Sequence, residues 1–100
     1  MNSIDAITLK YKMDGNEIIF LIDVRELWEH QEFNIGGQLI PLNSIFENLS
    51  LIPNDRPVII YCQKGIRSQL AIQRLQQKHN YHNLVNLSGG MSAWKRQLNL

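Results

Sequence analysis

Two unbroken runs of apolar, mostly β-branched residues constrain the fold of this chain more than any other feature. Residues 17–24 and residues 57–62 lack the alternation of apolar and polar side chains that marks a strand with one solvated face. Unbroken runs are typical of strands buried on both faces, as in a parallel sheet covered by helices. Pro57 is compatible with this interpretation, because a strand tolerates proline at its first residue. We therefore expect both runs to form central strands.

Helical patterns and further short strand patterns lie between and after these two runs. Residues 66–78 carry apolar side chains at helical spacing and end in a basic turn. The other elements expected from local pattern are short helices over 26–33 and 91–96 and brief strands over 39–40 and 84–87. The alternation of strand and helix predicts an α/β fold with a mostly parallel sheet, helices on both faces, and sites at the carboxyl ends of the strands.

Two additional short helices are expected from capping residues. Ser3 is predicted to cap a helix that carries Ile7 and Leu9 and ends at Gly15. Ser44, with a glutamate three positions later, forms a capping-box pattern that predicts a helix over residues 45–49.

The length of 100 residues limits the chain to one hydrophobic core. A chain of this size buries roughly 65% of the surface that its unfolded form exposes, which is enough for one domain and not for two. No linker, repeat or low-complexity stretch interrupts the sequence. We therefore expect a single domain over residues 1–100.

Charge and hydropathy give no indication of a nucleic-acid or membrane partner. Ten basic and nine acidic residues give a net charge of +1, and neither sign forms a long run. The apolar stretch at residues 18–22 is too short to span a bilayer, and residues 1–5 lack the basic flank and apolar core of a signal peptide. We expect a cytoplasmic protein.

Cys62 is the only cysteine, so the chain forms no internal disulfide and has no cysteine-based zinc site. The three histidines, His30, His79 and His82, are expected to face solvent or cap helix ends rather than bind a metal. The sequence therefore predicts neither a metal nor an organic cofactor.

Cys62 ends the second buried run and is followed by a short loop and a predicted helix. Gly65 allows the backbone of this loop to curl, so that successive N–H groups converge on one point near a helix N-terminus. Such a field stabilises an anion and favours the thiolate form of a cysteine. Cys62 is thus a candidate nucleophile. The alternative is that Cys62 is only a small apolar residue at the end of a strand.

Three blocks of the sequence resemble the rhodanese-like single-domain sulfurtransferases. The first comprises residues 21–26 with Trp28 and Glu29, the second residues 61–68, and the third residues 87–94. Their order and spacing extend the resemblance over nearly the whole chain. The resemblance implies a single rhodanese-like domain with a sheet of about five short strands.

The resemblance also implies a two-step sulfur transfer. The Cys62 thiolate would take a sulfane sulfur from thiosulfate or a protein persulfide and pass it to cyanide, a thiol or a protein acceptor. Lys64 and Arg67 would attract an anionic donor, and Asp23 and Arg25 would support the loop. The residues implied to bind the donor and hold the transferred sulfur are Gln63, Lys64, Gly65, Ile66, Arg67 and Ser68. Since no second cysteine is present, the acceptor must be external.

Several of these residues have a structural alternative. Arg67 could instead form a surface ion pair, and Lys64 could be a solvated loop tip. Trp28 and Trp94 are expected to pack in the core or as a lid rather than to form a binding platform.

Two other functions compete with sulfur transfer. A cysteine-dependent phosphatase also places its nucleophile in a strand–loop–helix cradle, but such enzymes have five residues between cysteine and arginine, and only four separate Cys62 from Arg67. The second competitor is a noncatalytic or carrier module, which would share the same residues.

Residues 33–42 depart from the family pattern. Asn34, Gly36 and Gln38 stand where the family usually has a histidine, a proline and an alanine. We expect this departure to alter a partner-recognising surface rather than the chemistry. The resemblance also allows for the chain being one domain of a longer protein, because such domains occur fused to adenylating enzymes.

Overall fold

The computed structural model describes residues 1–100 and contains one five-stranded sheet in the order β1-β5-β4-β2-β3. The strands are β1 (Ser3–Ile4), β2 (Phe20–Asp23), β3 (Gln38–Leu39), β4 (Val58–Tyr61) and β5 (Leu84–Leu87). Every pair of neighbouring strands is parallel. The predicted α/β fold with a parallel sheet of about five short strands is therefore confirmed.

Strands β2 and β4 form the interior of the sheet, as the two apolar runs predict. They pair in register, with Ile22 opposite Ile60 and Asp23 opposite Tyr61, and all four of these side chains are buried. The first strand is shorter than the run that predicts it, since Ile18 lies outside the sheet and is exposed.

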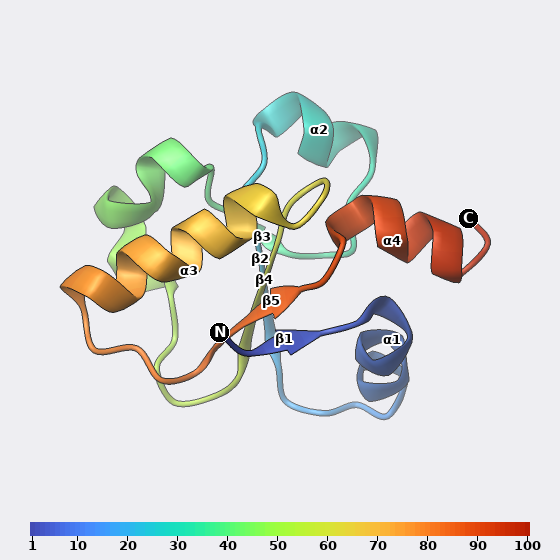
Figure 1. Ribbon diagram of the computed structural model, residues 1–100, viewed down its shortest axis with the longest axis horizontal. Coiled ribbons are helices and arrows are strands. Elements are labelled where there is room, and N and C mark those ends of the chain that lie inside the picture. Colours follow the sequence, from blue (N-terminus) through green and yellow to red (C-terminus); the bar gives the residue numbers. More distant parts are fainter.

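Helices cover both faces of the sheet (Figure 1). Helix α3 (Ile66–Lys78) and the 3₁₀ helix η1 (Leu42–Leu51) lie on one face, and α1 (Ala6–Asp14) and α4 (Gly90–Gln97) lie on the other. The length of the chain predicts one hydrophobic core, but the sheet divides the buried apolar side chains into two clusters, one on each face. The first cluster includes Ile22, Ile45, Ile60, Ile72 and Leu75, and the second includes Leu9, Ile59, Leu87, Met91 and Trp94. No helix is long and apolar enough to cross a membrane.

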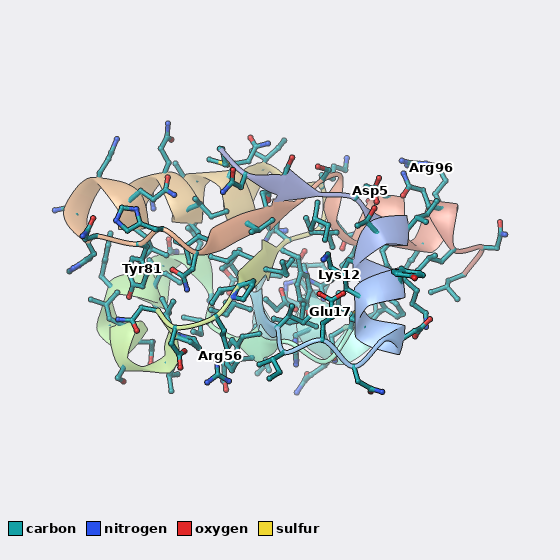
Figure 2. The ribbon with its side chains drawn as sticks, turned by 90° about the horizontal axis from the view of Figure 1, so that it is seen from below. Asp5, Lys12, Glu17, Arg56, Tyr81 and Arg96 are labelled. Atoms are coloured by element: carbon teal, nitrogen blue, oxygen red, sulfur yellow. The ribbon has the colours of Figure 1, made fainter.

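The start of the chain differs from the prediction. Ser3 belongs to β1 and pairs with Asn86 at the edge of the sheet, so it does not cap a helix. Asp5 is the residue that caps α1, and its carboxylate accepts a hydrogen bond of 2.7 Å from the backbone N–H of Thr8. At the other end of α1, Lys12 faces Glu17 at 3.2 Å, and this pair joins the helix to the segment that enters β2 (Figure 2).

The capping-box prediction at Ser44 is also wrong. The helix there is a 3₁₀ helix that begins after Pro41, and the backbone N–H of Ser44 already donates to the carbonyl of Pro41 at 2.8 Å. Ser44 is therefore inside the first turn and cannot cap it. A non-helical backbone conformation at Asn48 interrupts the segment and prevents a regular α-helix.

The two tryptophans have different environments. Trp94 packs in the core as predicted, with 4% of its surface exposed, but Trp28 is 66% exposed and the prediction for it is wrong. Trp28 belongs to α2 (Leu27–Glu32), which lies beyond the carboxyl ends of the strands rather than on a face of the sheet (Figure 1). The inward side of this short helix is occupied by Glu29 and His30, which make polar contacts.

Candidate active site

The site is built where the loop after β4, helix α2 and the start of α4 come together at one end of the molecule (Figure 1). The chain leaves β4 at Tyr61, turns through Cys62 and Gly65, and enters α3 at Ile66. Gly65 has a φ of 92°, in the left-handed region that favours glycine. A side chain at this position would also approach the backbone nitrogen of Gly89 to 3.1 Å. The tight turn therefore requires glycine.

Backbone N–H groups converge on the sulfur of Cys62. The N–H of Gly65 lies 3.1 Å from Sγ, the N–H of Ser68 lies 3.3 Å from it, and the Ser68 hydroxyl oxygen lies 3.4 Å away. The Ser68 hydroxyl also donates to the side-chain oxygen of Asn86 on β5. Cys62 is only 1% exposed. The N–H groups of Gly65 and Ser68 are the donors that stabilise negative charge on the sulfur.

A cavity of about 250 Å³ opens in front of this loop. It is lined by Glu29, Cys62, Gln63, Lys64, Ile66 and Arg67. The structure thus brings together most of the predicted site residues around one cavity, while Gly65 and Ser68 lie behind it, beside the sulfur.

Arg67 forms an ion pair with Glu29. Its two terminal nitrogens each donate to one carboxylate oxygen at 2.8 Å. The hydrogen bonds from Arg67 lower the pKa of Glu29 to about 2, and the same contact raises the pKa of Arg67. The predicted alternative for Arg67, an ion pair, is therefore present in the structure. Lys64, by contrast, is exposed and has no ion-pair partner.

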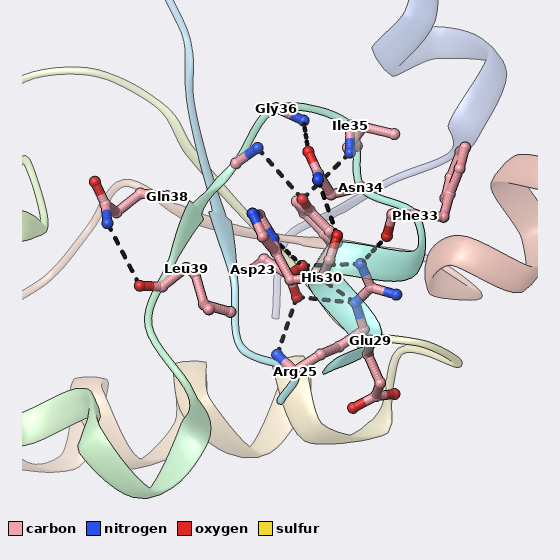
Figure 3. A network of polar contacts seen from close by, with 12 residues as sticks. Asp23, Arg25, Glu29, His30, Phe33, Asn34, Ile35, Gly36, Gln38 and Leu39 are labelled. Carbon is pink, nitrogen blue, oxygen red and sulfur yellow. Dashed lines mark hydrogen bonds and ion pairs between the residues drawn. The ribbon is translucent and has the colours of Figure 1, made fainter. Parts of the chain in front are cut away.

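Asp23 and Arg25 are buried and belong to one network of polar contacts (Figure 3). The guanidinium of Arg25 donates to both carboxylate oxygens of Asp23 at 2.9–3.2 Å and to the side-chain oxygen of Gln63 at 3.1 Å. The amide nitrogen of Gln63 in turn lies 3.3 Å from the hydroxyl of Ser92 on α4. A continuous set of hydrogen bonds therefore connects the end of β2 to the loop and to α4.

His30 is part of the same network and does not match its prediction. Its Nδ1 lies 2.9 Å from a carboxylate oxygen of Asp23 (Figure 3), and its side chain is only 20% exposed. It neither faces solvent nor caps a helix. The carboxylate of Asp23 accepts contacts from both His30 and Arg25, which compensates for its complete burial.

Helix α4 is hydrogen-bonded directly to the loop that follows β4. The N–H groups of Met91 and Ser92 donate to the carbonyls of Cys62 and Gln63, each at 2.9 Å. This approach is close enough that a Cβ on Gly90 would lie 2.3 Å from the carbonyl oxygen of Cys62. The second glycine of the pair in the third sequence block is thus explained by the contact between α4 and the loop.

The segment that departs from the family pattern packs on the other side of this network. Its backbone N–H groups at Ile35 and Gly37 point to the hydroxyl of Tyr61, at 3.5 and 3.3 Å. Burial raises the pKa of Tyr61 to about 12. No residue from 33 to 42 lines the Cys62 cavity.

Comparison with known protein families identifies the family to which this chain belongs. A family model described as Rhodanese-like domain matches residues 5–97. The chain belongs to the rhodanese-like domain family. It is 37% identical over 97 residues to a protein named Sulfurtransferase from Allochromatium vinosum, an alignment that covers 96% of this chain and 90% of that protein.

Two further relatives show the family in different contexts. The probable adenylyltransferase/sulfurtransferase MoeZ of Mycobacterium tuberculosis is 37% identical over 89 residues, which cover 86% of this chain and 22% of that protein. The crystal structure of a rhodanese-like domain protein from Staphylococcus aureus superposes with a TM-score of 0.85 at 32% identity, covering 94% of this chain and 91% of the other. The similarity thus spans most of this chain but only 22% of MoeZ.

Several residues of this rhodanese-like site were not predicted from the sequence. Glu29 stands inside the first block of the resemblance, and this position could have indicated that it belongs to the site. Ser92 likewise stands inside the third block, so the same signal existed for it. Asn86 and His30 lie outside the blocks and gave no such signal, because their contacts depend on how β5 and α2 are placed around the loop.

Proposed function

We propose that this rhodanese-like domain is a sulfurtransferase that carries sulfur as a persulfide on Cys62. In the first step, the Cys62 thiolate attacks the outer sulfur of thiosulfate and forms a sulfur–sulfur bond. The bond between the two sulfurs of thiosulfate breaks, and sulfite leaves with the electron pair. In the second step, cyanide or a thiolate attacks the outer sulfur of the persulfide, and the Cys62 thiolate is regenerated. The sulfur atoms and charges balance without a metal or redox cofactor.

The observation that carries this proposal is the convergence of the Gly65 and Ser68 N–H groups on the sulfur of Cys62. Both the attacking thiolate and the leaving thiolate of the second step bear negative charge, and these donors are already in place to stabilise it. A loop of this size suits a single sulfur atom.

The charges around the cavity support an anionic donor. Arg67 is neutralised by Glu29, so the free cation at the rim is Lys64. We infer that Lys64 attracts the donor from solution, whereas Arg67 and Glu29 together hold α2 against the loop.

Because Cys62 is buried, formation of the persulfide brings the sulfur to be transferred closer to the acceptor. A sulfur–sulfur bond adds about 2 Å to the side chain, so the outer sulfur of the persulfide lies farther into the cavity than Sγ itself. The acceptor then needs to reach only this outer sulfur and not the buried thiolate.

Steady-state formation of thiocyanate from thiosulfate and cyanide tests the proposal. The wild-type protein is expected to be active and Cys62→Ser inactive. Lys64→Gln is expected to raise the KM for thiosulfate by about three- to tenfold with a smaller change in kcat, as loss of an attracting charge predicts. Arg74→Gln, which removes an exposed cation from α3 away from the cavity, is the matched control and should change neither constant.

An active Cys62→Ser protein would refute this mechanism. A wild-type protein that forms the persulfide but does not release sulfur to small acceptors would instead support the alternative of a carrier module.

A further inference from the structure

A second cavity of about 250 Å³ adjoins the Cys62 cavity. It lies between α2 and α4, and its lining residues are Arg25, Trp28, Glu29, Glu32, Phe33, Gln63 and Lys95. Glu29 and Gln63 line both cavities, so the two cavities lie side by side at these residues. A molecule in the second cavity could therefore extend toward the sulfur of Cys62.

The polar groups of the second cavity fall into two sets. Arg25, Glu29 and Gln63 are committed to the hydrogen bonds that hold the loop. Glu32 and Lys95, by contrast, have no ion-pair partner. The ammonium of Lys95 lies 4.5 Å from the centre of the Phe33 ring, which holds it beside the cavity. The cavity therefore offers one free cation and one free anion.

An exposed aromatic surface lies beside these charges. Trp28 lines the cavity and is 66% exposed, although an indole of this size is usually covered by other side chains. Its ring can pack against the apolar atoms of a bound molecule, and its N–H group is available as a donor.

We propose that this second cavity binds the sulfur acceptor, and that the acceptor is a low-molecular-weight thiol carrying both an ammonium and a carboxylate group. The inference rests on the proposed sulfur transfer and adds the acceptor class to it. The carboxylate of the acceptor pairs with Lys95, its ammonium pairs with Glu32, and its carbon chain lies against Trp28. Its sulfur then points across Glu29 and Gln63 toward Cys62.

Size and charge both favour this class of ligand. A cavity of about 250 Å³ is smaller than those that enclose drug-sized molecules and matches a molecule the size of an amino acid. A dianion such as thiosulfate could pair with Lys95 there but would leave Glu32 facing a like charge, whereas Lys64 is at the rim of the first cavity. The donor and the acceptor thus have separate places in two neighbouring cavities.

The transfer step is balanced. The thiolate of the acceptor attacks the outer sulfur of the Cys62 persulfide, and a new sulfur–sulfur bond forms on the acceptor. The bond to Cys62 Sγ breaks and leaves its electron pair on the Cys62 thiolate. The product is a persulfide of the small thiol.

Binding of S-methyl-L-cysteine, which has the same charged groups but no reactive thiol, tests the subsite without requiring catalysis. In ¹⁵N-labelled protein, the indole N–H signal of Trp28 is expected to shift saturably, while that of the buried Trp94 stays fixed. Lys95→Gln and Glu32→Gln are each expected to weaken this binding by about tenfold or more, since each removes one charge pair. Arg96→Gln, which removes an exposed cation one residue away from Lys95, should bind as the wild type does.

Absence of a saturable Trp28 shift, or equal binding by Lys95→Gln, Glu32→Gln and Arg96→Gln, would overturn the inference.

A kinetic comparison of three small thiols tests the acceptor subsite separately from the proposed function. Persulfide-loaded wild-type protein should transfer sulfur to cysteine with a higher kcat/KM than to cysteamine, which lacks the carboxylate, or to 3-mercaptopropionate, which lacks the ammonium. If no persulfide forms, the proposed function fails, and the titration with S-methyl-L-cysteine still shows whether the second cavity binds this class of ligand. If the persulfide forms but reacts equally with all three thiols, only the subsite fails.

Discussion

Glu29 on α2 and Arg67 on α3 are joined by two parallel hydrogen bonds of 2.8 Å at the mouth of the Cys62 cavity. The two residues of this ion pair are 38 positions apart in the sequence. The same Glu29 carboxylate also accepts a hydrogen bond from the backbone N–H of Glu26 and so caps its own helix. One side chain therefore fixes α2 both internally and against the loop that holds the sulfur.

This arrangement predicts an acid-dependent loss of stability. The folded-state pKa of Glu29 is about 2, below its ordinary value of 4.5. The folded protein therefore binds this proton less readily than the unfolded chain. The pair contributes its full stability above pH 4.5 and loses it as the pH falls toward 2. In Glu29→Gln, the free energy of unfolding from urea titrations should fall less steeply with decreasing pH over this window.

Glu47→Gln is the matched control, because Glu47 is exposed and makes no ion pair. Its unfolding free energy should follow the wild-type pH dependence. Identical pH dependence in Glu29→Gln and the wild type would contradict the role given to the Glu29 carboxylate.

The close approach of α4 to the loop predicts a large cost for a side chain at Gly90. In Gly90→Ala the new Cβ would overlap the carbonyl of Cys62, a backbone atom that cannot rotate away. We expect a loss of about 3 kcal/mol or more in the free energy of unfolding. Gly36→Ala provides the comparison, because Gly36 also has a positive φ of 93° but no atom within 4 Å of the added Cβ.

Gly36→Ala should therefore lower the free energy of unfolding by the backbone strain alone, about 1–2 kcal/mol. Urea unfolding of the two variants separates strain from overlap. Equal destabilisation would show that α4 does not press on the loop as closely as the structure indicates.

The buried pair of Asp23 and Arg25 predicts a strong effect on stability. Asp23→Asn removes the charge that compensates Arg25, which is 2% exposed. Leaving a guanidinium buried without its counter-ion should lower the free energy of unfolding by about 3–5 kcal/mol. Asp55→Asn removes the carboxylate of an exposed pair with Arg56 and should have no measurable effect. Chemical denaturation of both variants checks this, and a mild effect at Asp23 would mean that Arg25 finds another partner or reaches solvent.

The sheet could be predicted from the sequence because burial leaves a local signature. Strands β2, β4 and β5 are short, but their residues are largely apolar, and each was located within a few positions. β1 could not be found in this way. It has two residues, it lies at the edge of the sheet, and its Ser3 has the same local pattern as a helix cap.

The site could be predicted only in part, for a related physical reason. Cys62 and the loop residues after it are neighbours in sequence, so a glycine-containing turn before a helix was enough to indicate an anion cradle. The contacts of Glu29, His30 and Ser92 link separate elements and depend on where α2 and α4 lie. The exposure of Trp28 has the same origin, because an apolar residue in a short helix gives no sign of which side faces the protein.

Intact mass after incubation with thiosulfate and desalting shows whether Cys62 itself carries the transferred sulfur. We predict a gain of about 32 Da that dithiothreitol removes, and its absence in Cys62→Ser, whose folding is checked by circular dichroism; a sulfinic acid of the same nominal mass would not be reversed by a thiol. A wild-type protein that gains no such mass from thiosulfate or from a small-molecule persulfide, while Cys62 remains open to alkylation, would show that Cys62 is not the sulfur carrier.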